Sequence, residues 1–168
     1  MGFNIKNIKV NPLTSGLSAI IKNPLVRAAG EIKTDDPTAR WAVFGNQKFS
    51  NLLKPHQIDV INGIHPVPNF EDMKILDPTG KDINIYNRYA HINLYYHKDG
   101  GDNVYFQLNE NKTVNDNYTI IIHPCSEKLK QLKVKYTVFT YPPTQEEIMC
   151  MTLVKNLGEL TIYKRNDL

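Results

Sequence analysis

Short segments of alternating apolar and polar residues fill the second half of this sequence, and they limit the possible folds more than any other feature. The alternation is clear in HINLYYH, where Ile92 and Leu94 share one face while His91 and Asn93 share the other. A period of two residues is that of a β-strand with one buried face. The C-terminal part of the chain is therefore predicted to be built from strands.

About seven such segments follow one another between residues 74 and 165, with turn residues about every 8 to 14 positions. The first two are expected at residues 74–76 and 83–86, and the run DPTG between them has the signature of a type I turn. No helical crossover is visible, which disfavours a doubly wound α/β fold. We therefore predict a mainly β fold: an antiparallel β-sandwich, jelly-roll or immunoglobulin-like, or a barrel, with one face of each sheet in water.

The clearest strand is QLKVKYTVFTY, which ends at a pair of prolines. By alternation its apolar residues face inward, and Lys133, Lys135 and Thr137 face water. The segments EIMCMTLV and GELTIYK, joined at residues 155–158, are typical of a hairpin.

The first 70 residues differ from the rest and are predicted to be an N-terminal arm and an extended connecting segment, ahead of a body at residues 71–168. Short helices are expected at residues 15–23 and 24–30, the second with Pro24 at its first position. The run ARWAVF fits a helix or a strand, and its Trp and Val residues favour a strand. The arm carries apolar residues that need to pack on the body or on a neighbouring subunit: Leu17, Ile20, Ile21, Leu25 and Val26.

The net charge of +3 is concentrated near the N-terminus, where residues 1–34 hold five Lys or Arg and one Glu. This density is low for phosphate neutralisation, so no direct nucleic-acid contact is expected. No apolar run has the length of a membrane-spanning helix and no signal peptide is recognised, so no membrane contact is expected. With no secretory signal, Cys125 and Cys150 are expected as reduced thiols by default, and a disulfide across strands is the alternative for a secreted protein.

No constellation of residues predicts catalysis, a cofactor or a metal. The five histidines are scattered, and His91 and His97 stand about 20 Å apart along an extended strand, too far to share one ion. Nucleophile, phosphate-loop and dinucleotide motifs are absent. The sequence therefore predicts a protein that is not an enzyme.

The stretch YYHKDGGDNVYFQL is interpreted as the tip of a hairpin. Its two glycines permit a reversal, and its carboxylates are too few for a calcium loop. On the strand before it, Tyr95 and His97 face outward, and an aromatic side chain on a flat β surface can contact a partner protein or a sugar. We treat these two residues, with the apolar residues of the arm, as the candidate interaction surface, and favour a protein partner over a carbohydrate.

The layout of an arm up to about Phe70 followed by strands from Lys74 to Lys164 resembles that of small viral and phage structural subunits. In those proteins, extended arms tie β-sandwich bodies into shells, rings or tails. The resemblance implies a non-enzymatic structural or assembly protein, a subunit of a homo-oligomeric particle such as a virion capsid, connector or phage tail. Its partners would be copies of itself and other structural proteins. Its location would be the virion, or otherwise the cytoplasm.

Two alternatives remain open from the sequence. One is a β-sandwich module that binds a carbohydrate or another ligand, and the other is a small enzyme whose site leaves no sequence signal. The order of the strands, the symmetry of the oligomer and the path of the arm also remain open.

Overall fold

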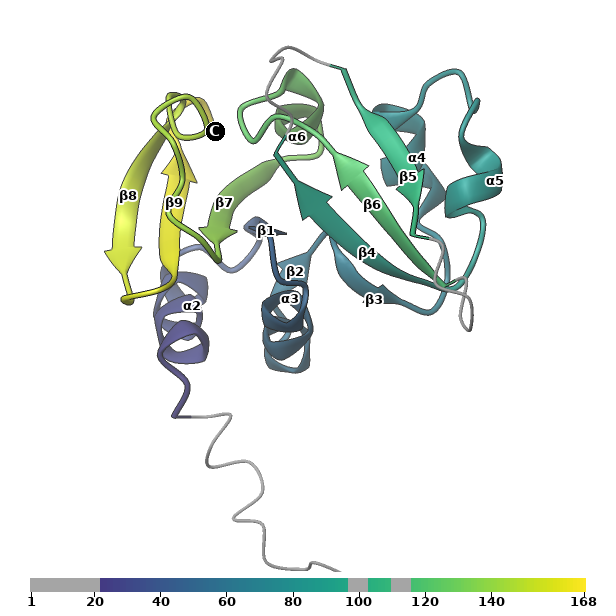
Figure 1. Ribbon diagram of the computed structural model, residues 1–168. Helices are drawn as coiled ribbons and strands as arrows, with labels where there is room; N and C mark the ends of the chain where they lie inside the picture. The colour runs from purple at the N-terminus through teal and green to yellow at the C-terminus, as the bar shows by residue number, and fades with distance from the viewer. Residues whose placement is uncertain (1–21, 97–102, 110–115) are drawn as a thin grey trace, which may run out of the picture.

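A mixed β-sheet runs through the computed structural model, which describes residues 22–96, 103–109 and 116–168 (Figure 1). Its strands are β1 (Arg40–Phe44), β2 (Asp59–Val60), β3 (Gly63–His65), β4 (Ala90–Tyr95), β5 (Tyr105–Leu108), β6 (Asn117–Ile121), β7 (Val134–Phe139), β8 (Met151–Asn156) and β9 (Thr161–Arg165). Within these described residues the nine strands form one sheet with the order β5-β6-β4-β1-β7-β9-β8, and β2 and β3 branch from β1 and β4. The prediction of a mainly β fold is confirmed, whereas a sandwich or barrel is not.

Short helices connect the strands and cover the sheet. They are α2 (Pro24–Asp35), α3 (Lys48–Leu53), the 3-10 helix η2 (Lys54–His56), α4 (Phe70–Leu76), α5 (Ile83–Tyr86) and α6 (Glu127–Gln131). Helix α2 begins as predicted, with Pro24 in its first turn and the Asn23 side chain accepting a hydrogen bond from the Leu25 amide.

The centre of the sheet is parallel, so the prediction of antiparallel pairing throughout is wrong. Strand β1 pairs in parallel with β4 and β7, and β4 pairs in parallel with β6, which gives the central order β6-β4-β1-β7. Antiparallel pairing is confined to the flanks, at β5–β6 and β7–β9–β8, and to β3–β4. The error arose because residues 70–76 and 83–86, which we expected to include strands, form α4 and α5, and because α6 was not recognised.

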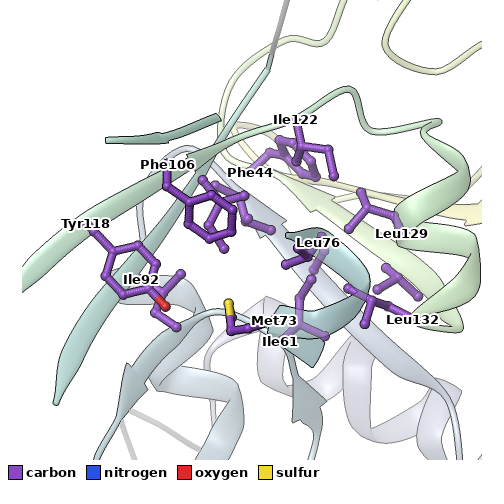
Figure 2. Packing of buried hydrophobic residues seen from close by; sticks show 14 of the residues in the cluster. Phe44, Ile61, Met73, Leu76, Ile92, Phe106, Tyr118, Ile122, Leu129 and Leu132 are labelled. Carbon is purple, nitrogen blue, oxygen red and sulfur yellow. The ribbon is translucent and has the colours of Figure 1, made fainter. Parts of the chain in front are cut away.

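Both faces of the central sheet are covered, which corrects the expectation of one solvated face. In β1, Trp41 and Val43 belong to a cluster with residues of α2 and α3, while Ala42 and Phe44 belong to a second cluster with residues of α4, α5 and α6. Figure 2 shows the second cluster around Phe44. Thr137, predicted to face water, is 0% exposed because β7 lies between two strands and under cover on both sides.

The predicted arm and body are not separate in the described part of the chain. Strand β1 lies within residues 1–70, yet it pairs with β7 along its whole length at the centre of the sheet. The expectation that ARWAVF forms a strand is confirmed, but the boundary at residue 70 divides one sheet. Residues 1–21 lie outside the described residues.

Two short strands, β2 and β3, lie between β1 and β4, where β2 pairs with β1 and β3 with β4, because β7 and β6 occupy the other edges of β1 and β4. Asn62 stands at the turn between β2 and β3 and is 0% exposed. Its Oδ1 accepts a hydrogen bond from the Val43 amide at 3.0 Å, and its Nδ2 donates one to the Val43 carbonyl at 2.9 Å. The side chain thus supplies the two bonds that a neighbouring strand would give.

The residue after Asn62 has to be small. Gly63 has a φ of 94°, and a Cβ at this position would lie 2.6 Å from the side-chain oxygen of Asn51. That oxygen accepts a hydrogen bond from the Ile64 amide and so fixes the start of β3. Asn62 and Gly63 together hold the turn between β2 and β3 in the gap between β1 and β4.

Candidate functional site

The structure divides the sequence-predicted interaction residues into three groups. Leu17, Ile20, Ile21 and His97 lie outside the described residues. Leu25 and Val26 are buried in α2, with exposed fractions of 0% and 6%, so they are not available to a partner. Tyr95 is 48% exposed at the end of β4, and the predicted alternation of buried and outward residues in this strand is confirmed.

A cleft opens beside the carboxyl end of β7, and we refer to it as the β7 cleft. It has a volume of about 620 Å³, and it is lined by residues 140–143 and by Asn156, Gly158, Glu159 and Thr161. Residues 140–143 follow β7 directly. The other lining residues form the turn of the β8–β9 hairpin and the strand ends beside it, and the pairing of β9 with β7 brings them next to residues 140–143. The cleft therefore depends on the strand order, which the sequence left open.

The β7 cleft lies beside the topological switch point of the sheet, where successive strands are added on opposite sides of β1. From β1 the chain proceeds to β4 and β6 on one side, and α6 then leads it back to β7 on the other side of β1. In open sheets with parallel strands, ligands bind outside the carboxyl ends of the strands at such a point. This edge is thus the first place to look for a ligand site.

Gly45, directly after β1, allows the chain to pass close to Thr140, which directly follows β7. It has a φ of 93°, and a Cβ there would lie 2.3 Å from Oγ1 of Thr140. The Thr140 amide donates to the Phe44 carbonyl, and Thr140 Oγ1 accepts from the Asn46 amide at 2.8 Å. These bonds fasten the carboxyl ends of β1 and β7 to each other.

A buried carboxylate, that of Glu147, binds Tyr141 in the wall of the β7 cleft. Glu147 is 1% exposed and accepts hydrogen bonds from the Tyr141 hydroxyl at 2.5 Å and from the amide and hydroxyl of Thr144 at 2.8 and 3.0 Å. Burial, together with the bond to Glu147, raises the pKa of the Tyr141 hydroxyl well above its usual range. The hydrogen bond to Glu147 fixes the orientation of the Tyr141 hydroxyl.

Strand β8 forms an outer edge of the sheet, as Figure 1 shows. It pairs with β9 on one side, and no strand of the described residues pairs with its other side. Residues 152–156 are all exposed, and the exposed fractions of Leu153 and Val154 are 48% and 40%. Lys155, the single charged residue of β8, makes an ion pair with Glu31 of α2 at 3.0 Å. An exposed edge strand with apolar residues is a surface on which another strand can add.

Cys125 and Cys150 form a disulfide, which corrects the default expectation of two reduced thiols. Their Cα atoms lie 5.7 Å apart, a separation usual for a disulfide. The bond links the segment between β6 and α6 to the residue just before β8. It therefore ties the start of the exposed edge strand to the segment that follows β6.

Arg165 of β9 also binds the segment between β6 and α6. Its guanidinium donates hydrogen bonds to the carbonyls of Pro124, Cys125 and Ser126 at 3.2 to 3.3 Å, and its side chain is 1% exposed. It also makes two bonds to the Asp167 carboxylate, at 2.9 and 3.2 Å. These bonds lower the pKa of Asp167 to about 2.

Removal of the disulfide is expected to lower the free energy of unfolding by about 3 kcal/mol, because a 25-residue loop becomes free in the unfolded chain. The double variant Cys125→Ser/Cys150→Ser would be compared with the oxidised protein by urea denaturation, with and without dithiothreitol. Reductant should destabilise the natural chain and leave the double variant unchanged. Equal stabilities for the two chains under oxidising conditions would contradict this expectation.

A second charged cluster lies at the amino end of β1 and serves to hold the fold. Arg40 makes ion pairs with Asp72 at 2.7 Å and with Asp59 at 2.9 Å. Nearby, burial lowers the pKa of Lys54 to about 8, opposed in part by Asp59, and Lys54 donates a hydrogen bond to the Ile64 carbonyl. Because its amine is used to fix β3, Lys54 is better explained as a structural donor than as a catalytic base.

Among the described residues, no group of three or more His, Cys, Asp or Glu side chains is arranged to hold a metal ion. None of the helices in the described ranges combines the length and the apolar character that crossing a membrane requires.

A family model matches residues 19–167, and the family is described as "Domain of unknown function (DUF7654)". The match covers the whole mixed sheet and its helices, and the chain therefore belongs to this family. No curated protein matches the chain, and no solved structure does.

Proposed function

We propose that this protein is a non-enzymatic assembly subunit that associates with copies of itself through the outer edge of β8. The observation that carries the proposal is the row of exposed residues 152–156 on a strand with one edge open. Addition of a strand to such an edge gains main-chain hydrogen bonds and covers apolar side chains. Leu153 and Val154 are the residues that would be covered.

A second copy of β8 is the occupant that fits the charges best. If two β8 strands pair antiparallel about a twofold axis at Leu153, then Lys155 of each lies opposite Met151 of the other. The two lysines do not face each other, and each is already paired with Glu31 of its own chain. The contact would be isologous, as in the commonest class of symmetric dimer.

The disulfide supports a setting for this assembly. Disulfides persist in oxidising compartments and are rare in the cytosol, so the bond between Cys125 and Cys150 favours an oxidising location over the cytoplasm that we expected from the sequence. A virion or phage tail as the particle stays a prediction. A contribution of the arm residues Leu17, Ile20 and Ile21 to assembly stays one as well.

Light scattering after size exclusion tests the proposal with the full chain. The natural protein is expected to be a dimer or larger at about 100 μM, a concentration that a micromolar interface would saturate. The double variant Leu153→Lys/Val154→Lys, called the β8-lysine variant, should be monomeric, because like charges would face each other across the twofold axis.

The matched control for the β8-lysine variant is Val67→Lys, because Val67 is 71% exposed and lies outside β8. This control should assemble as the natural chain does. A natural chain that is strictly monomeric, or a β8-lysine variant that assembles equally well, would overturn the proposal.

A further inference from the structure

The β7 cleft has the size and the walls of a small-molecule site. Its volume of about 620 Å³ falls within the range of ligand pockets, about 300–1,000 Å³. One wall is the run Tyr141-Pro142-Pro143, which offers an aromatic ring and two pyrrolidine rings. The facing wall, from the β8–β9 turn, offers the amide of Asn156 and the carboxylate of Glu159.

The apolar wall is rigid before any ligand arrives. Glu147 fixes the Tyr141 hydroxyl, and the two prolines have few conformations open to them. Gly158, with a φ of 88°, sets the turn that carries Glu159. A site whose walls are already ordered loses little entropy when a ligand binds.

The charge of the lining residues limits the class of ligand. Glu159 is the charged residue among those that line the cleft, and the described lining contains no Lys or Arg. A phosphate or carboxylate group would meet repulsion here and no cation to bind it. Thr161, in the same lining, carries a hydroxyl oxygen that has no hydrogen-bond partner in the described residues.

We infer that the β7 cleft binds a neutral saccharide. A pyranose ring has an apolar C–H face, which suits Tyr141 and the prolines. Its hydroxyl groups suit the carboxylate oxygens of Glu159 and the side-chain amide of Asn156, whose oxygen also accepts a hydrogen bond from the Gly158 amide. Tyr95, the tyrosine singled out from the sequence, ends β4 on the same carboxyl edge of the sheet. The inference moves the carbohydrate alternative from the surface around Tyr95 on β4 to the cleft beside β7, two strands further along the sheet.

The test is titration of the ¹⁵N-labelled full chain with glucose, galactose, mannose, maltose, cellobiose and lactose, each up to about 20 mM, which detects millimolar affinities. At least one of these sugars is expected to shift the amide signals of residues 141 and 156–161. Glucuronate and glucose 6-phosphate should bind at least about tenfold more weakly, because each adds a negative charge facing Glu159. Absence of shifts at these residues with every neutral sugar would overturn the inference, as would equal binding of the charged sugars.

Variants at Glu159 separate a ligand contact from an indirect effect. Glu159→Ala should weaken binding of the responding sugar about tenfold, and Glu159→Gln, which keeps an acceptor oxygen, should weaken it less. Glu71→Gln, on the exposed surface of α4, is the control and should bind as the natural chain does. Unchanged affinity in Glu159→Ala would contradict the site.

The β8-lysine variant makes the saccharide test independent of assembly. If this variant is monomeric and binds the same sugar with unchanged affinity, the cleft acts without the proposed interface. Loss of sugar binding in this variant with an intact fold would contradict a site formed within one chain.

Discussion

Replacement of Asn62 by Leu is expected to lower the free energy of unfolding by about 4 kcal/mol. Leucine has a similar shape but no hydrogen-bonding atoms, so the amide and the carbonyl of Val43 lose the partners that Asn62 provides at 3.0 and 2.9 Å. Each buried backbone group left without a partner costs about 1–3 kcal/mol. A loss of this size is a large part of the roughly 5–15 kcal/mol that stabilises a domain.

Urea denaturation followed by circular dichroism measures the effect of Asn62→Leu. Asn84→Leu, at an exposed position of α5, is the matched control and should change stability by less than about 0.5 kcal/mol. Hydrogen exchange at the Val43 amide gives a local readout and should become faster in the Asn62 variant alone. If Asn62→Leu loses less than about 1 kcal/mol, the side chain does not act as a substitute for a strand.

Replacement of Arg165 by Met is expected to cost about 3 kcal/mol, because buried carbonyls that lose a donor each cost about 1–3 kcal/mol, whereas the partner Asp167 is exposed to water and stays solvated. The carbonyls of residues 124–126 would each lose the guanidinium as a donor, and within the described part of the chain that of Ser126 alone would keep a second one, the Lys130 amide. Asp167 would also lose the hydrogen bonds that depress its pKa to about 2.

Lys164→Met on the same strand is the control for Arg165→Met, because Lys164 is exposed and should cost less than about 1 kcal/mol. The pH dependence gives a second readout. The folded-state pKa of Asp167 is about 2 against an ordinary value of 3.8, so its stabilising contribution is complete above pH 3.8 and is lost as the pH falls toward 2. In Arg165→Met this loss between pH 3.8 and 2 should be smaller. Equal stability of Arg165→Met and Lys164→Met would contradict the assigned role of Arg165.

The sequence predicts strands well where alternation extends over five or more residues, and it fails where elements are short. Strands β4, β6, β7 and β9 were expected at the positions where they occur. Residues 83–86 were expected to be a strand because Ile83 and Ile85 alternate with polar residues, yet they form one turn of helix. In segments of four residues the periods of two and 3.6 cannot be told apart.

The direction of the strands could not be predicted because it depends on the connections. Helix α6 has five residues, and its sequence signal is the single cap Ser126, whose hydroxyl accepts from the Leu129 amide. With α6 unrecognised, the order of β6 and β7 stayed open, and in the sheet two other strands separate them in the order β6-β4-β1-β7. Parallel order brings distant parts of the chain together, and no local pattern encodes it.

The candidate sites depend on that order, and for this reason no local pattern in the sequence predicted them. The run Tyr141-Pro142-Pro143 indicated the end of a strand, and it became a cleft wall because β9 lies alongside β7. No sequence pattern singled out Arg165, which is buried and donates hydrogen bonds to the carbonyls of residues 124–126. Asn62-Gly63 is a turn signal that the sequence did contain, within a segment we had interpreted only as a connection.

Hydrogen exchange at β8 as a function of protein concentration tests the central claim, self-association through this strand, most directly. The amides of residues 152–155 that do not bond to β9 are expected to exchange freely in dilute solution and to become protected as the concentration rises, in step with the mass measured by light scattering. The amides of β7, which is already paired on both edges, should keep the same protection throughout. Exchange at residues 152–155 that does not change with concentration, while the protein assembles, would show that another surface makes the contact and would contradict the account.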